Sequence, residues 1–152
     1  MSDAMTSPTP EPAGPSTAAD PIEVVQRFLG ALQRLDIDDA VALMTPDVTY
    51  QNVPLPAAQG IDAVEKQLRW LARYGSGFEV EYLNVAADGS TVLTERTDIL
   101  VFGKVRAAFW VCGIFEVRDG RIALWRDRFD FVDVTWAFLR GGVRALLAAA
   151  RG

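Results

Sequence analysis

Two Asp-Gly dipeptides, Asp88-Gly89 and Asp119-Gly120, punctuate the second half of this 152-residue chain. Asp-Gly favours the tight turns that join neighbouring antiparallel strands. The strand-like runs around these dipeptides cover residues 78–86, 91–102, 106–117 and 121–132. The pattern predicts a four-stranded antiparallel meander, and it excludes the alternating strand and helix order of a Rossmann fold.

Helical patterns flank this meander. Residues 20–23 combine an Asp N-cap, a Pro at the first helical position and the Glu of a capping box, and apolar residues follow at helical spacing. The other expected elements are helices over about 37–44, after Gly60 and from about 133 or 135 towards 150, bent at Gly141-Gly142, and a short strand over 47–53. This order predicts an α+β fold in which helices cover one face of a curved sheet.

The length and composition fit one domain, expected over residues 20–152. Residues 1–19 are expected to form a disordered leader, because they are rich in Pro, Ser, Thr and Ala and lack the pattern of a signal peptide. The net charge of −5 and the lack of a basic cluster argue against a nucleic-acid partner. No apolar run is long enough for a membrane span. A lone cysteine in an apolar run, Cys112, indicates a buried, reduced thiol and a cytoplasmic protein.

Charged residues interrupt the apolar strands at positions that alternation places on one face. Arg96 and Asp98 are two residues apart, and Asp127 can join them from a nearby strand. Buried charges are costly unless they are paired, so this group is either a structural ion network or an acid–base site. The chain contains no histidine, so proton chemistry would have to use carboxylates or tyrosine.

The turns also predict how the strands pair. If the second Asp-Gly dipeptide is a two-residue loop, Asp127 lies opposite Cys112. If Lys104 forms the tip of the preceding hairpin, Arg96 also lies opposite Cys112, two strand spacings or about 10 Å from Asp127. Four apolar residues would share this face and line a pocket for a small lipophilic ligand: Trp110, Ile114, Trp125 and Phe129.

Two aspartates bridged by an arginine suit the hydrolysis of a strained, uncharged ring. One carboxylate, kept ionised by the guanidinium, would remove a proton from water, and the other, kept protonated by its apolar surroundings, would protonate the leaving oxygen. Tyr50 and Asn52 alternate on the expected short strand, so they share a face and could hold that water. Neither metal-ligand spacing nor a phosphate-binding loop occurs in the sequence.

Three segments together resemble the limonene-1,2-epoxide hydrolase family: residues 50–52, 93–98 and 120–130. The resemblance covers most of residues 20–135. It implies a strongly curved, mixed but mostly antiparallel sheet, as in the ketosteroid isomerase and nuclear transport factor superfamily, with helices over the concave side forming a deep apolar pocket. It also implies a homodimer that adds water to an epoxide in one step, without metal or organic cofactor.

The resemblance gives each polar residue an expected role. Asp127 resembles the base that activates water, and Tyr50 and Asn52 resemble the residues that position this water. Asp98 resembles the acid that protonates the epoxide oxygen, and Arg96 resembles the bridge between the two carboxylates. The long apolar C-terminal segment suggests larger, lipid-like or sterol-like epoxides.

Two other functions remain open at this point. The chain could be another proton-transfer enzyme of the same fold, an isomerase or a cyclase, or it could be a non-catalytic lipid-binding module. The last helix is expected to be a lid or a dimer surface rather than a membrane anchor, because Arg140, Arg144 and Arg151 interrupt it.

Overall fold

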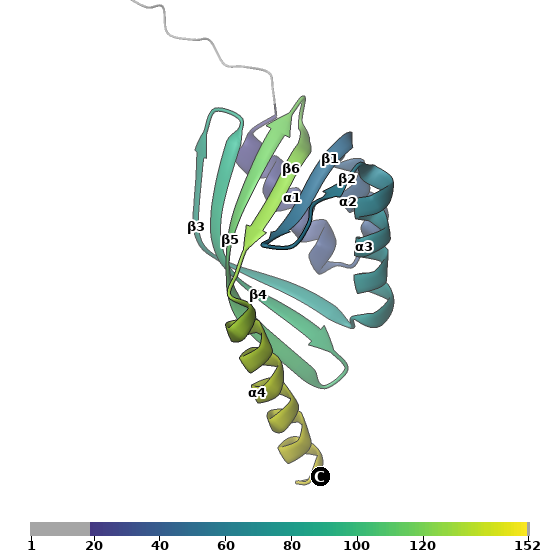
Figure 1. Ribbon diagram of the computed structural model, residues 1–152, viewed down its shortest axis with the longest axis vertical. Coiled ribbons are helices and arrows are strands. Elements are labelled where there is room, and N and C mark those ends of the chain that lie inside the picture. The colour runs from purple at the N-terminus through teal and green to yellow at the C-terminus, as the bar shows by residue number, and fades with distance from the viewer. Residues whose placement is uncertain (1–18, 152) are drawn as a thin grey trace, which may run out of the picture.

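The computed structural model describes residues 19–151 (Figure 1). The expected leader therefore lies outside the described residues, apart from its last position. The helices are α1 (Pro21–Gln33), α2 (Ile37–Ala42), α3 (Ile61–Tyr74) and α4 (Phe131–Ala149). The strands are β1 (Met44–Val53), β2 (Ala58–Gln59), β3 (Gly77–Asp88), β4 (Thr91–Phe102), β5 (Val105–Arg118) and β6 (Arg121–Arg128).

The six strands form one sheet in the order β2-β1-β6-β5-β4-β3. β1 runs parallel to β6, and all other neighbouring pairs are antiparallel. This curved, mixed but mostly antiparallel sheet with packed helices confirms the predicted fold class. We call the face that α1 covers the inner face of the sheet, and the opposite one the outer face.

The core fills the space between α1 and the inner face. α1 begins at its N-cap Asp20, whose carboxylate accepts a hydrogen bond from the Ile22 N–H at 3.0 Å. From this helix, Phe28 packs edge-on against Trp125 of β6 and Phe115 of β5, with ring centroids 5.1 and 6.4 Å apart. Such aromatic pairs bury large apolar areas and fix the distance between helix and sheet.

Two details of the hairpins correct the predicted strand pairing. Phe102 pairs with Val105, which makes Gly103-Lys104 a two-residue loop and places Arg96 opposite Val111 instead of Cys112. Arg118 does pair with Arg121 across the Asp-Gly turn, as predicted. A bulge then shifts the β5–β6 register by one residue, so Asp127 lies opposite Gly113.

The consequence for the two faces follows from the alternation of side chains along β5. Val111 and Gly113 point to the same face, so Arg96 and Asp127 stay together in spite of both corrections. Cys112 points to the other face, together with Trp110 and Ile114, and is half-buried there rather than buried as predicted. The prediction that the β5 residues Trp110 and Ile114 share the face of Arg96 and Asp127 is therefore wrong.

Helix α4 covers the part of β5 that β6 leaves unpaired. β6 ends at Arg128, opposite Cys112, so residues 105–111 pair with no other described strand on that edge of β5. Gly141 packs against the main chain of Arg106, where a Cβ would overlap with the carbonyl oxygen. The helix continues without a break through Gly141-Gly142, so the predicted bend is wrong. The glycine serves close packing instead, and the helix protects an open strand edge.

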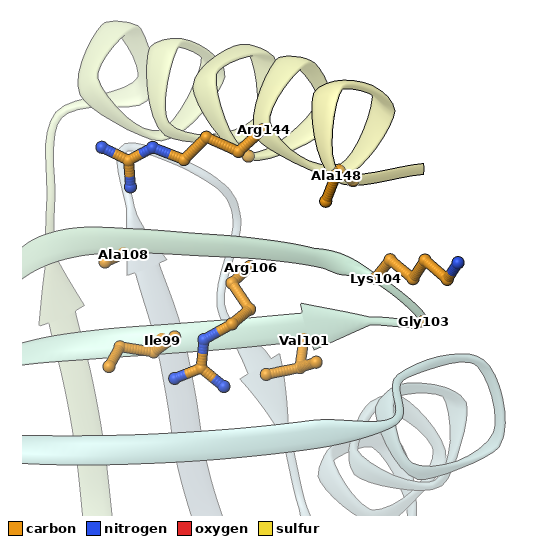
Figure 2. A pocket seen from close by; sticks show the side chains of 10 residues that line it. Ile99, Val101, Gly103, Lys104, Arg106, Ala108, Arg144 and Ala148 are labelled. Atoms are coloured by element: carbon orange, nitrogen blue, oxygen red, sulfur yellow. The ribbon is translucent and has the colours of Figure 1, made fainter. Parts of the chain in front are cut away.

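A hollow of about 610 Å³ lies between the last turns of α4 and the β4–β5 hairpin (Figure 2). On the strand side it is lined by Ile99, Val101, Arg106 and Ala108. These residues alternate with the inner-face residues of both strands, so the hollow lies on the outer face, away from Arg96 and the two aspartates. Among the residues that the structure describes, no helix has the length and apolar character needed to cross a membrane.

Candidate active site

A buried ion network joins β4 to β6. Arg96 is fully buried, and only 5% of Asp98 and 4% of Asp127 are exposed. Arg96 Nε donates to Asp98 Oδ1 at 2.8 Å. Its Nη2 donates to Asp98 Oδ2 at 3.2 Å and to Asp127 Oδ2 at 2.6 Å. The structure thus brings together the three charged residues that the sequence singled out.

Strand β1 places Tyr50 and Asn52 beside this network. Because β1 pairs in parallel with β6, Tyr50 lies next to Trp125 and Asn52 lies next to Asp127. The Tyr50 ring stacks on the Trp125 ring with centroids 4.0 Å apart, and its hydroxyl accepts a hydrogen bond from Asn52 Nδ2 at 2.7 Å. All five predicted polar residues therefore share the inner face.

One oxygen of the network has no hydrogen-bond partner in the described part of the chain, although the Trp125 indole faces the Asp127 carboxyl and lowers its pKa. Asp127 Oδ2 accepts from Arg96, but the buried Asp127 Oδ1 accepts no hydrogen bond from residues 19–151. A buried polar atom is costly unless it is hydrogen-bonded. With the amide of Asn52 and the phenol of Tyr50 on the neighbouring strand, this oxygen can accept a hydrogen bond from a water or a substrate.

Burial and the single guanidinium set the charge of the site. Burial raises the pKa of Asp98 to about 6, although Arg96 opposes this rise. Burial also raises the pKa of Asp127, again against the effect of Arg96. One guanidinium neutralises one carboxylate, so the network is electrically neutral when the two aspartates share one proton. Such a pair titrates as a unit and contains one acid and one base at the same time.

The structure corrects two of the four predicted apolar site residues. Trp110 is 47% exposed on the outer face, where its Nε1 donates to Glu95 at 3.0 Å. Ile114 also points outward, opposite Leu93 of β4. Neither residue lines the inner face, because the β4–β5 register differs by one residue from the predicted one.

Trp125 and Phe129 do lie on the inner-face side of the network. Trp125 is buried between Tyr50 and the core, and Phe129 packs against Phe109 with ring centroids 5.7 Å apart. Phe109 pairs with Asp98 across the β4–β5 ladder. Phe109 therefore takes the position next to Asp98 that the predicted register would give to Trp110.

Three further residues next to the network were missed from the sequence. Thr94 accepts a hydrogen bond from Arg96, and Gly113 lies directly below the guanidinium. Tyr82 of β3 pairs with Arg96, and its buried hydroxyl has no hydrogen-bond partner among residues 19–151. Two features of the sequence pointed to Thr94 and Gly113. Thr94 precedes Arg96 by two residues, and a glycine inside a strand often marks a close approach of other groups.

Comparison with known proteins gives the same family at the level of sequence and structure. The limonene-1,2-epoxide hydrolase catalytic domain matches residues 19–140. The epoxide hydrolase EphG of Mycobacterium tuberculosis (strain ATCC 25618 / H37Rv) is 44% identical over 127 residues, which cover 84% of this chain and 85% of that protein. The solved structure of an M. tuberculosis LEH-like epoxide hydrolase has a TM-score of 0.80 at 44% identity, over 86% of this chain and 98% of the other.

A more distant structure shares the fold alone. SalBIII, an epoxide hydrolase/cyclase-like enzyme of pyran ring formation in salinomycin, is 17% identical, with a TM-score of 0.68 over 74% of this chain and 92% of its own. The family match over residues 19–140 and the 44% identity to EphG show a much closer relationship than the 17% identity to SalBIII does. On this basis, the chain belongs to the limonene-1,2-epoxide hydrolase family.

Proposed function

We propose that this protein adds water to a lipophilic epoxide in one step and releases a vicinal diol. The observation that carries the proposal is the buried Asp98–Arg96–Asp127 network, which has room for one proton on its two carboxyls and in which Asp127 Oδ1 accepts no hydrogen bond from the described residues. Family membership supports the same chemistry. No metal or organic cofactor enters this mechanism.

In the proposed reaction, Asp127 is the base and Asp98 is the acid. Asp127 takes a proton from water while the water oxygen forms a bond to one epoxide carbon. The bond between that carbon and the ring oxygen breaks, and the ring oxygen takes the proton of Asp98. Tyr50 and Asn52 hold the water. The negative charge moves from one carboxyl to the other, and Arg96 contacts both, so the total charge of the buried network does not change.

We further propose that the substrate is larger than a simple monoterpene epoxide, in the size range of fatty-acid or sterol epoxides. Three aromatic rings form a row of contacts from Asp98 to the start of α4. Phe109 pairs with Asp98 and contacts Phe129, and Phe129 contacts Phe131. An extended aromatic surface suits a long lipophilic molecule better than a compact one.

The experiment that tests the proposed function is diol formation from a panel that runs from limonene oxide to fatty-acid and sterol epoxides. Diol from the wild type is expected, with the highest kcat/KM for the larger members. A folded protein that forms no diol from any epoxide would contradict the hydrolase. Tight binding of an intact epoxide in that case would favour the binding module.

The pH dependence of the reaction is expected to identify Asp98 as the acid. Asp98 must carry its proton to protonate the epoxide oxygen, so kcat/KM should fall as the pH rises through about 6, the pKa to which burial raises this carboxyl. Asp98→Asn should lower kcat by roughly 10²–10⁴-fold. The remaining activity should no longer fall over that pH range. An alkaline limb that persists unchanged in Asp98→Asn would assign it to a different group.

We also propose that two copies of the chain form a homodimer. Six large apolar side chains are exposed on the side of α4 that faces away from β5: Val132, Trp136, Leu139, Val143, Leu146 and Leu147. At about 100° per residue, Arg140 and Arg144 fall on the flank of this stripe rather than within it. The outer face of the sheet adds the exposed Leu83, Leu93 and Trp110. Exposed apolar surface of this extent is typical of an interface.

Light scattering is expected to give twice the mass of one chain. Leu93→Glu places a charge on the outer face beside Ile114 and should shift the protein towards monomer. Leu55→Glu is the matched control, because Leu55 and Leu93 are both 49% exposed, and it should leave the mass unchanged. A wild-type protein with the mass of one chain would contradict the dimer.

A further inference from the structure

Arg96 has a third partner besides the two aspartates. Its Nη1 donates to Thr94 Oγ1 at 2.8 Å, and Thr94 is itself buried. Thr94 precedes Arg96 by two residues on β4, so both side chains point to the inner face. The guanidinium is therefore held on three sides: by Asp98 through Nε and Nη2, by Asp127 through Nη2, and by Thr94 through Nη1.

Gly113 provides the space in which these groups meet. Thr94, Gly113 and Asp127 form one row across β4, β5 and β6. A Cβ at Gly113 would overlap with Arg96 Nη1, and it would lie 2.7 Å from Thr94 Oγ1 and 2.8 Å from Asp127 Oδ1. The three atoms thus converge above the Gly113 Cα, and any side chain at this position would displace the guanidinium.

This convergence gives Nη1 a choice between two acceptors. Thr94 Oγ1 takes it, whereas Asp127 Oδ1 accepts no hydrogen bond from residues 19–151. If Nη1 turned to Asp127 Oδ1, Arg96 would bind both oxygens of Asp127 as a two-pronged pair, the strongest geometry between these groups. Arg96 would then occupy the oxygen that the proposed reaction assigns to water, and Asp127 would become a weaker base.

We propose that Thr94 and Gly113 are positioning residues, which direct Arg96 Nη1 away from Asp127 Oδ1 and keep that oxygen open to the attacking water. The inference rests on the proposed epoxide hydrolysis, and neither residue contacts the reacting atoms. The other titratable groups that face the network are the phenols of Tyr50 and Tyr82. Burial raises the pKa of both, so they stay neutral over the pH range in which the aspartates titrate.

The test compares Thr94→Val, which keeps the shape but removes the acceptor, with Thr94→Ser, which keeps the hydroxyl. Thr94→Val should lower kcat roughly 10- to 100-fold, the range expected when one buried hydrogen-bond partner is lost, with little change in KM. The pH profile should broaden at the same time. Closer pairing with Arg96 lowers the pKa of Asp127 and moves the acidic limb down, while weaker pairing raises the pKa of Asp98 and moves the alkaline limb up. Thr94→Ser should behave like the wild type.

A purely structural Thr94 would give a different result. Thr94→Val would then melt at a lower temperature but keep the wild-type kcat and both pH limbs, and this outcome would overturn the proposal. Thr94→Ala removes the same acceptor with less bulk and replaces the valine variant if that protein does not fold. The expected changes in kcat and in the pH limbs, and the outcome that would overturn the proposal, are the same for Thr94→Ala.

The proposal can also be tested apart from catalysis. If the wild type forms no diol, the proposed function fails, but the placement of Arg96 can still be measured by carbon-13 NMR titration of the aspartate carboxyls. Thr94→Val should then titrate Asp98 at a higher pH than the wild type does. Identical Asp98 and Asp127 titrations in the two proteins would overturn the positioning role.

Discussion

Asp127→Asn is expected to reduce diol formation by roughly 10³-fold or more, while the protein stays folded. An amide has nearly the shape of the carboxyl but cannot take a proton from water. The variant is expected to lose the acid as well as the base, because it retains one guanidinium and one carboxyl in the buried network. Asp98 would then ionise to balance Arg96, and the site would lose the proton that the acid must supply.

The measurement is the rate of diol formation at saturating epoxide, together with circular dichroism and a thermal melt of each protein. Asp133→Asn is the matched control, because it makes the same chemical change at an exposed position of α4 and should leave the rate unchanged. A variant at position 127 with wild-type turnover would remove Asp127 from the proposed mechanism.

Local sequence was sufficient to predict the parts of this fold that local chemistry determines. Asp119 and Gly120 both have positive φ, 52° and 72°, which is the geometry that an Asp-Gly hairpin turn requires. Arg96, Asp98 and Asp127 were found because alternation alone places the first two together and because buried charges need partners. These inferences do not depend on an exact register.

The predictions that proved wrong concern features that depend on contacts between distant segments. The residues around Gly103 fit more than one hairpin loop, and the bulge between β5 and β6 has no signature in the local sequence. Each shifts a pairing by one residue, which was enough to exchange Trp110 for Phe109 on the inner face. Gly141 had suggested a bend, but the neighbouring β5 edge fixes a continuous helix there, and that edge lies some thirty-five positions earlier in the chain.

Arg96→Lys keeps the charge of the network and is expected to lose both activity and stability. An ammonium is a single point charge, and it cannot contact Asp98, Asp127 and Thr94 together as the planar guanidinium does. One carboxyl would remain buried without a partner. We therefore expect the free energy of unfolding to fall by about 3–5 kcal/mol, the cost typical of a broken buried ion pair. Diol formation should fall by roughly 10²-fold or more, because the acid and the base are no longer held in place.

The pH dependence of this stability loss gives a second check. A buried, unpaired carboxyl has a pKa above its unfolded value of about 3.9, so the folded state holds the proton more tightly than the unfolded state. The deficit relative to the wild type should therefore be small below pH 4 and should grow as the pH rises through the folded pKa. Chemical denaturation of both proteins between pH 4 and pH 8 measures this difference.

Arg126→Lys is the matched control for this prediction. Arg126 is the β6 residue just before Asp127, but it points away from the network and donates to Gln51 at 3.1 Å. The same substitution there should change neither the turnover nor the pH dependence of stability. Wild-type stability and turnover in Arg96→Lys would mean that the positive charge alone matters. The planar guanidinium would then not be needed, and Thr94 would have no positioning role.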